Sequence, residues 1–407
     1  MIKQKNTGGI ILSIAFVAAV ALFGFLYSTY QIPTVEEPPK AEADVLETWS
    51  PDSSAANGHP LEENKDIYKE GVDTNVYDVY ITAFPTKDEK GKILTLKDFA
   101  LHTPRNHDYN PVLKCHIDIK PQGVKPGLDL GTDTIPNATI RVRGNSSRGD
   151  AYKSYKVNLY EDAQPFQGQM SLNINKHTED DMKIITKLCT DLLRDVPDIC
   201  SYNTTFMRVW MQDASKPRGE REYEYQGLYT QTEQPNKTYL RRRGLSADGT
   251  LYKARDFSFM PREELVNVDD SSYSEKEFEK ILGIREGEDH RKLLEMVGAV
   301  NDYTTDFQST FNKYFNEDNY LTFLATSILF GAEDILNHNF LLYNPSNSET
   351  WYFIPWDFDS NLDIHSTYHM EPSLAGGQKL NMIPLHKRFF RMEGSLEKLE
   401  KKIDEVF

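Results

Sequence analysis

The sequence predicts an α+β fold in which a largely antiparallel sheet forms the first half and helices dominate the second. Short runs of alternating apolar and polar residues, separated by Gly, Pro, Asn and Asp, recur through residues 75–245 and are typical of strands. Apolar residues at helical spacing predominate in residues 270–330. The 407-residue chain is 39% hydrophobic and 12% aromatic, which is the composition of a globular protein.

The first 30 residues predict a membrane-targeting segment. Lys3 and Lys5 precede "GGIILSIAFVAAVALFGFLY", a run of about twenty uncharged residues that is long enough to cross a bilayer as a helix. The flank "STYQIP" lacks a small-x-small cleavage pattern, so we expect an uncleaved signal anchor, with a removed signal peptide and secretion as the alternative. Lysines before the span and acidic residues after it predict that the rest of the chain lies outside the cytoplasm.

The next segment, residues 31–74, is rich in acidic residues and Pro and poor in apolar residues, so we expect a disordered linker. The folded domain then spans residues 75–407. Strands are expected at 76–84, 112–120, 138–144 and 154–160, a helix within 179–196, a hairpin of 204–213 with 223–234, and helices at 275–284, 290–300 and 319–330. The apolar face of the helix within 179–196 would comprise Met182, Ile185, Leu188, Cys189, Leu192 and Leu193.

The charge and cysteine content exclude several classes of protein. A net charge of −16 with no long basic run disfavours a nucleic-acid partner and instead attracts divalent cations. Three cysteines do not make a disulfide scaffold: Cys189 and Cys200 could pair and leave Cys115 over, or all three could be buried thiols. No Cys/His spacing typical of a zinc site is present.

A hairpin near residue 347 brings together the residues best suited to bind a metal. The runs "NFLLY" and "TWYFI" flank the turn-forming "NPSNSE", and a turn centred at Asn347 places Asn339 opposite Pro355 and Asp357 opposite Asn337. The open end then gathers carboxylate and amide groups, from Asp334, Asn337, Asn339, Asp357 and Asp359. Carboxylates cluster stably only around a cation or hydrogen-bond donors, unless they are simply well solvated.

A calcium loop is a weaker interpretation of the same carboxylates. Asp357, Asp359, Asn361 and Asp363 occupy positions one, three, five and seven of an EF-hand. However, Leu362 replaces the required Gly, and Tyr368 replaces the bidentate Glu.

A basic turn suits phosphate binding. In "IRVRGNSSRGDAYKSYKVNLY" a Gly/Ser-rich turn joins two strands that carry basic residues, and the candidate binding residues are Arg141, Arg143, Asn145, Ser146, Lys153 and Lys156. Backbone N–H groups and cations of such a turn can hold phosphates. The alternative is an ordinary hairpin with a basic edge.

Three stretches in this order, "IRVRGNSSRGDAYKSYKVNLY", "YQGLYTQTEQPNKTYL" and "DILNHNFLLYN…WYFIPWDFDSNL", resemble the spore coat protein H (CotH) kinase family over roughly residues 75–395. The resemblance implies an atypical protein-kinase-like fold, with a sheet-rich nucleotide lobe at 75–245 and a helical catalytic lobe at 246–407. It also implies transfer of the γ-phosphate of ATP, with Mg²⁺ or Mn²⁺, to Ser or Thr of secreted or coat proteins.

The resemblance also implies roles for particular residues. Asp334 corresponds to the catalytic aspartate, and Asn339 and Asp357 correspond to metal ligands. From its place at the hairpin end, Asp359 is expected to bind the metal together with them. Either Lys153 or Lys156 would hold the phosphates; strand alternation puts them on opposite faces, and we favour Lys153. Glu233 would lie near the nucleotide or pair with a basic residue.

Two other functions remain as alternatives. Apolar Ile335 and Leu336 follow Asp334 where the family often has a basic residue and His, so the chain could be an inactive pseudokinase that organises a coat or wall assembly. A glycan hydrolase would need two carboxylates set across a cleft instead of carboxylates with an Asn and a basic loop. The sequence makes no prediction of oligomeric state.

Overall fold

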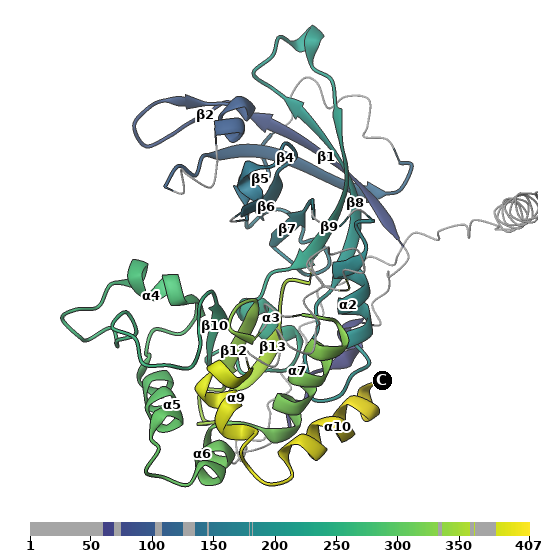
Figure 1. Cartoon of the computed structure of the whole chain (residues 1–407). Helices are drawn as coiled ribbons and strands as arrows, with labels where there is room; N and C mark the ends of the chain where they lie inside the picture. Colours follow the sequence, from purple (N-terminus) through teal and green to yellow (C-terminus); the bar gives the residue numbers. More distant parts are fainter. Residues whose placement is uncertain are drawn as a thin grey trace, which may run out of the picture. The chain divides into compact units, whose positions relative to one another are not determined.

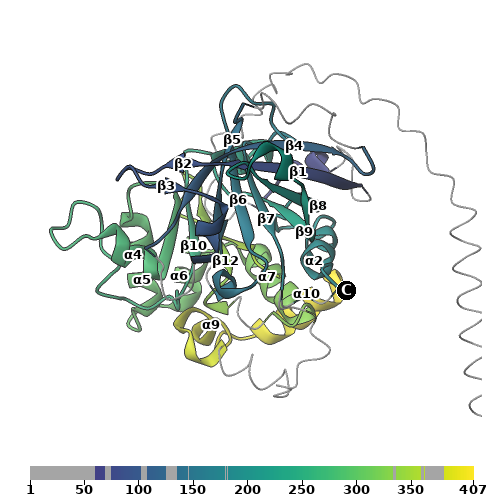
Figure 2. The ribbon, with the colours of Figure 1, turned by 90° about the horizontal axis from the view of Figure 1, so that it is seen from above.

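Seven strands of the first half of the chain close into a β-barrel (Figures 1 and 2). The computed structural model describes residues 60–68, 75–101, 108–124, 135–144, 146–178, 180, 182–332, 336–358, 362 and 380–407. The barrel strands are β1 (Val76–Phe84), β4 (Val112–Pro121), β5 (Ala138–Arg143), β6 (Ser154–Leu159), β7 (Ser171–Asn175), β8 (Thr204–Asp213) and β9 (Glu224–Glu233). Their order around the barrel is β1-β4-β5-β6-β7-β9-β8.

The barrel forms because each strand alternates apolar with polar side chains, so that one face of every strand can be buried. All neighbouring strands are antiparallel except β1 and β8, which pair in parallel from Val76 opposite Phe206 to Ala83 opposite Asp213. This parallel pair closes the barrel. The interior is apolar and includes Val79, Ile140 and Val157, none of which has measurable exposure.

A second, four-stranded sheet lies in the later half of the chain, in the order β11-β10-β12-β13 (Figure 1). Its strands are β10 (Thr250–Ala254), β11 (Leu282–Glu286), β12 (Phe340–Asn344) and β13 (Tyr352–Pro355). The helices of this half are α4 (Glu275–Ile281), α5 (Arg291–Asn301), α6 (Phe307–Tyr314), α7 (Glu317–Leu329), α9 (Pro384–Phe389) and α10 (Ser395–Val406). Helix α7 packs against β13 and α10, and its start is capped by Asn316, whose side chain accepts from the backbone N–H of Asn319.

The shorter elements complete the chain. Helix α2 (Ile185–Leu193) lies between β7 and β8 in sequence, and α3 (Lys237–Arg242) lies between β9 and β10. A small ribbon pairs β2 (Thr86–Lys87) with β3 (Ile93–Leu94). Four 3₁₀ turns are described: η1 (Lys65–Tyr68), η2 (Leu96–Leu101), η3 (Ser146–Gly149) and η4 (Arg218–Glu220).

A buried ion network holds the segment around Glu63 against the end of β9. Arg243, which has no exposed surface, lies 3.2 Å from Glu63 and 2.8 Å from Glu233. Arg242 donates to the other oxygen of Glu233 at 2.9 Å. Burial raises the pKa of Glu63, and Arg243 offsets this rise only in part. Burial also acts to raise the pKa of Glu233, but Arg243 and Arg242 outweigh it, so that the pKa is lowered. The folded unit therefore includes residues upstream of the predicted start at residue 75.

The predicted protein-kinase-like fold, with an antiparallel sheet followed by a helical half, is wrong. The sheet closes into a barrel through one parallel pair, and the later half contains a four-stranded sheet among its helices. The prediction missed this topology because β1 pairs with β8, a strand far along the chain. The alternation of residues within a strand does not reveal which strand will be its partner.

The structure does not support the predicted transmembrane anchor either. Within the described ranges, no helix is both long and apolar enough to cross a membrane. The segment that carried this prediction, residues 1–30, lies outside the described residues, as does most of the predicted linker.

Helix α2 differs in part from its prediction, and the cysteines follow the second of their two predicted alternatives. Cys189 and Leu193 are buried as predicted, but Leu188 and Leu192 are 43% and 50% exposed. The buried side is instead partly polar, because Thr190 bonds to Thr204 on β8. All three cysteines are free, buried thiols, so Cys189 and Cys200 do not pair.

Candidate active site

The open end of the β12–β13 hairpin places Asn339 and Asp357 side by side. The strands pair antiparallel as predicted, but one residue out of the predicted register, because Phe340 rather than Asn339 faces Pro355. The carbonyl of Asn339 accepts from the N–H of Trp356 at 3.0 Å. Both candidate ligands have left-handed backbone, with φ of 50° for Asn339 and 67° for Asp357. Such backbone is uncommon outside glycine and is concentrated at functional sites.

A lysine on the neighbouring strand β10 faces this hairpin end. Lys253 Nζ lies 3.7 Å from Asp357 Oδ2 and 5.6 Å from the centre of the Trp356 ring. Burial lowers the pKa of Lys253 to about 8, against the opposing effect of Asp357, and nearby arginines lower it further. Lys253 is therefore a partly desolvated cation beside a candidate metal ligand.

Three basic residues share the outer face of the barrel. Tyr155 and Val157 lie in the barrel interior, so Lys156 between them faces outward. Arg141 lies directly opposite Lys156 across the β5–β6 pair, and Arg143 is two residues further along the same face. Burial lowers the pKa of Lys156 to about 8, and the neighbouring arginines add to the effect.

The two sets of cations lie close enough to repel each other. Arg143 of the barrel and Arg285 of β11 each lower the pKa of both Lys156 and Lys253. Arg285 is itself mostly buried, which lowers its pKa, and Arg255 and Arg141 contribute to that shift. We call these six residues the cationic cluster: Arg141, Arg143, Lys156, Lys253, Arg255 and Arg285.

Several polar groups in and beside the cationic cluster lack partners. Within the part of the chain that the structure describes, no hydrogen bond or ion pair holds the side chains of Arg141 and Arg285. Asn173, on the same barrel face, is 1% exposed, and neither of its amide atoms has a partner in the described residues. Glu279 offsets part of the charge of Arg285. Partly desolvated cations whose charge is not fully compensated are costly, so this arrangement is suited to binding an anion.

Other predicted residues are placed differently. Lys153 Nζ donates to the carbonyl of Arg148, and only Lys156 joins the cationic cluster. Glu233 was predicted either to lie near the nucleotide or to pair with a basic residue, and it pairs with Arg242 and Arg243. Asp334, Asp359 and Asn145 lie outside the described residues, and so does the side chain of Ser146.

Sequence reasoning missed Lys253, Arg255, Arg285 and Asn173. The alternating basic residues of "YKAR", at the end of β10, resemble those of "IRVR" in β5, and this similarity could have drawn attention to Lys253 and Arg255. Arg285 was not recognised because "EKEFEKILGI", which precedes it, has the pattern of one helix. In the structure α4 ends at Ile281, and β11, which contains Arg285, begins at the next residue.

The oxygen donors at the hairpin end fit a hard divalent cation. Mg²⁺ prefers carboxylate and amide oxygens and keeps several waters, so Asp357 and Asn339 would hold it from one side. Within the described residues no group of three or more His, Cys, Asp or Glu side chains could hold a metal ion. When bound, the cation would neutralise phosphate charge beside Lys253.

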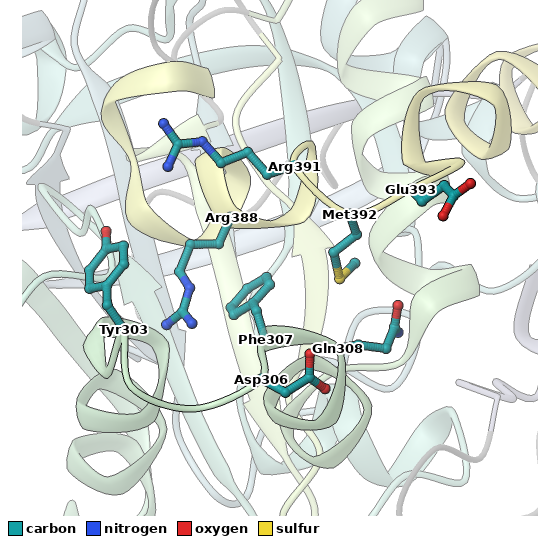
Figure 3. A pocket seen from close by; sticks show the side chains of 8 residues that line it. All are labelled: Tyr303, Asp306, Phe307, Gln308, Arg388, Arg391, Met392 and Glu393. Atoms are coloured by element: carbon teal, nitrogen blue, oxygen red, sulfur yellow. The ribbon is translucent and has the colours of Figure 1, made fainter.

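A pocket of about 380 Å³ on the helical side is separate from this site (Figure 3). Arg388 lies over the rings of Tyr303 and Phe307 and donates to three backbone carbonyls, those of Val300, Asp302 and Thr305. Arg388 therefore ties α9 to the end of α5. None of the residues that line this pocket belongs to the cationic cluster or to the hairpin end.

Comparison with known proteins shows which family the chain belongs to. Residues 140–406, which include the cationic cluster and the hairpin, match the family described as CotH kinase protein. The chain is also 29% identical over 231 residues to the inner spore coat protein H of Bacillus subtilis (strain 168). That match covers 56% of this chain and 59% of the relative. The chain therefore belongs to the CotH kinase protein family.

Proposed function

We propose that this protein is an ATP-dependent protein kinase that uses Mg²⁺ or Mn²⁺ and phosphorylates Ser or Thr of secreted or coat proteins. The observation that carries the proposal is the cationic cluster: its member Lys253 lies 3.7 Å from Asp357, and Arg143 of the barrel and Arg285 of the second sheet act on both Lys253 and Lys156. Phosphoryl transfer needs this combination, because catalysis consists mostly of positioning the phosphates and neutralising their charge.

Each group has a specific role in this proposal. Arg141, Lys156 and Arg285 bind the phosphate oxygens, and Asp357 and Asn339 hold the metal ion. Asp334 accepts the proton of the acceptor hydroxyl as its oxygen bonds to the γ-phosphorus, and ADP leaves with the electron pair of the broken P–O bond. The role of Asp334 rests on the family resemblance.

The name of the relative supports our proposals for the acceptor and the location. The Bacillus subtilis protein is named as an inner spore coat protein, so we propose a coat or other extracytoplasmic location and a protein acceptor found there. The same name favours a second candidate function. A coat protein can act as a structural component without turnover, and a pseudokinase would use this fold for assembly.

Calorimetry of ATP binding to the purified chain tests the proposal. We expect binding that requires Mg²⁺ or Mn²⁺ and is abolished in Asp357→Ala. The matched control is Asp248→Ala, which removes an exposed carboxylate from the turn before β10 and should bind ATP like the wild type. Transfer of labelled γ-phosphate to a Ser-rich protein acceptor would then establish a kinase. Absence of ATP binding by the folded wild type would favour the structural function.

A further inference from the structure

We infer that Asn173 is a phosphate-binding residue, and that its side-chain Nδ2 donates to a phosphate oxygen of the bound nucleotide. This inference rests on the proposed function, because it assigns a further residue to the same site. Asn173 is suited to this role by its position on the barrel, its burial and the hydrogen bonds that its neighbours make.

The register of β7 places Asn173 on the face that carries the cationic cluster. Leu172 and Ile174, on either side of it, lie in the barrel interior, so Asn173 faces outward. It is directly opposite Lys156 on β6. Because Lys156 is directly opposite Arg141 on β5, the three side chains form one row across three adjacent strands.

Asn173 is the exception among the asparagines of this face. Asn175 Nδ2 donates to Thr232 Oγ1 at 3.1 Å, and Asn158 Oδ1 accepts from Ser171 Oγ at 2.8 Å. Asn173 is 1% exposed, yet within the described chain both of its amide atoms lack a partner. A buried amide without hydrogen bonds destabilises a fold, whereas Leu at this position would bury no unpaired polar group.

The neighbours of Asn173 select the ligand group. Lys156 and Arg141 are both cations, and the acceptor that the structure gives Lys156, the neutral Gln234 Oε1, is 3.4 Å away. A ligand atom among these three side chains should therefore carry negative charge. A phosphate oxygen can accept from the amide and from both cations at once, and hydrogen bonds to a charged acceptor are the stronger kind. The base of the nucleotide, which is neutral, would not need this row of cations.

The test compares Asn173→Leu with the wild type in the full chain. The two ligands are Mg·ATP and inorganic tripolyphosphate with Mg²⁺, and calorimetry measures both. We expect Asn173→Leu to lower the affinity for both ligands by about tenfold or more, which is the usual effect of losing one charge-assisted hydrogen bond. We also expect its melting temperature to equal or exceed that of the wild type, because a buried unpaired amide has been removed.

Asn158→Leu is the matched control, since it changes the same residue type on the same barrel face and should bind both ligands like the wild type. Unchanged affinity for both ligands in a folded Asn173→Leu would overturn the inference. Weaker binding of ATP with unchanged binding of tripolyphosphate would also overturn it, because Asn173 would then contact the base of the nucleotide. A fall in both stability and affinity would also overturn it, because that result indicates a structural role. Failure of the wild type to bind either ligand would instead overturn the proposed function.

Discussion

The ammonium of Lys253 lies 3.7 Å from the carboxylate of Asp357 and so connects β10 to the residues that follow β13. Each partner is also suited to a different part of a metal–nucleotide complex, because the carboxylate can bind the metal and the ammonium can bind a phosphate. Asp357 therefore compensates the charge of Lys253 in part in the free protein. When a ligand arrives, the carboxylate and the ammonium can separate to bind the metal and a phosphate.

Loss of the Lys253 charge should weaken nucleotide binding without unfolding the protein. We expect Lys253→Met to lower the affinity for Mg·ATP by roughly tenfold or more, since hydrogen bonds between charged groups contribute about 1.5–3 kcal/mol. Lys276→Met, which removes a highly exposed ammonium, is the matched control. Calorimetry measures both variants. Equal affinities for Lys253→Met and the wild type would show that Lys253 only pairs with Asp357.

Nucleotide binding should weaken as the pH rises through 8. Lys156 and Lys253 both have a pKa of about 8, so they are charged at pH 7 and largely neutral at pH 9. Each lysine whose proton is needed for binding contributes up to about a tenfold loss of affinity per pH unit above its pKa. In Lys156→Arg the decline should be shallower, because arginine stays charged. An ATP affinity that is constant from pH 7 to pH 9.5 would contradict this prediction.

The stability of the free protein should respond to pH in the opposite direction. Both lysines have their pKa lowered from 10.5, so the unfolded chain binds their protons more tightly than the folded chain. Their unfavourable effect on folding is fully present below pH 8 and is relieved as the pH rises from 8 towards 10.5. Urea unfolding should therefore show that Lys156→Met stabilises the free protein more at pH 7 than at pH 10. The same gain at both pH values would argue against a charged, desolvated Lys156.

The buried ion network should be sensitive to removal of its central arginine. Arg243→Met leaves Glu63 and Glu233 without their shared counter-ion, and loss of one partner of a buried pair typically costs about 3–5 kcal/mol. Arg241→Met changes an exposed arginine of the same helix and should cost less than about 0.5 kcal/mol. Chemical denaturation measures the difference. A similar small effect of both substitutions would show that the network contributes little to folding.

Two adjacent leucines of α2 should differ sharply in their contribution to stability. Leu193 has no exposed surface, so Leu193→Ala should cost about 2–5 kcal/mol. Leu192 is 50% exposed, so Leu192→Ala should change the free energy of unfolding by less than about 1 kcal/mol. Equal losses would support the buried face predicted from the sequence in place of the observed one.

Local features of this fold were predictable from the sequence. Strand β1 spans Val76–Phe84 as predicted, the hairpin of β8 with β9 and that of β12 with β13 are both present, and the helices at α5 and α7 were expected. These elements depend on the alternation or helical spacing of neighbouring residues, which the sequence displays directly. The positions of Asn339 and Asp357 at one hairpin end followed from the same reasoning, to within one residue of register.

The features that could not be predicted depend on distant parts of the chain. The only local signal for Lys253 is the alternation of basic residues in "YKAR", and Lys253 joins the candidate site because β10 pairs with β12. Asn173 lies in a five-residue strand between turns, and its significance is its burial without a partner. The polar buried side of α2 likewise depends on Thr204, which belongs to another element. Contacts of this kind are set by tertiary packing rather than by local pattern.

The parallel pairing of β1 with β8 has a consequence for how the chain is made. Asp78 and Arg208, ion-paired across this seam, are 130 residues apart. During synthesis β1 therefore emerges long before its partner and exposes an unpaired strand edge until residue 213 has been translated. Folds whose closing contacts lie so far apart in sequence form slowly. We infer that barrel closure is a late step in folding and that the nascent chain is most prone to aggregation before it.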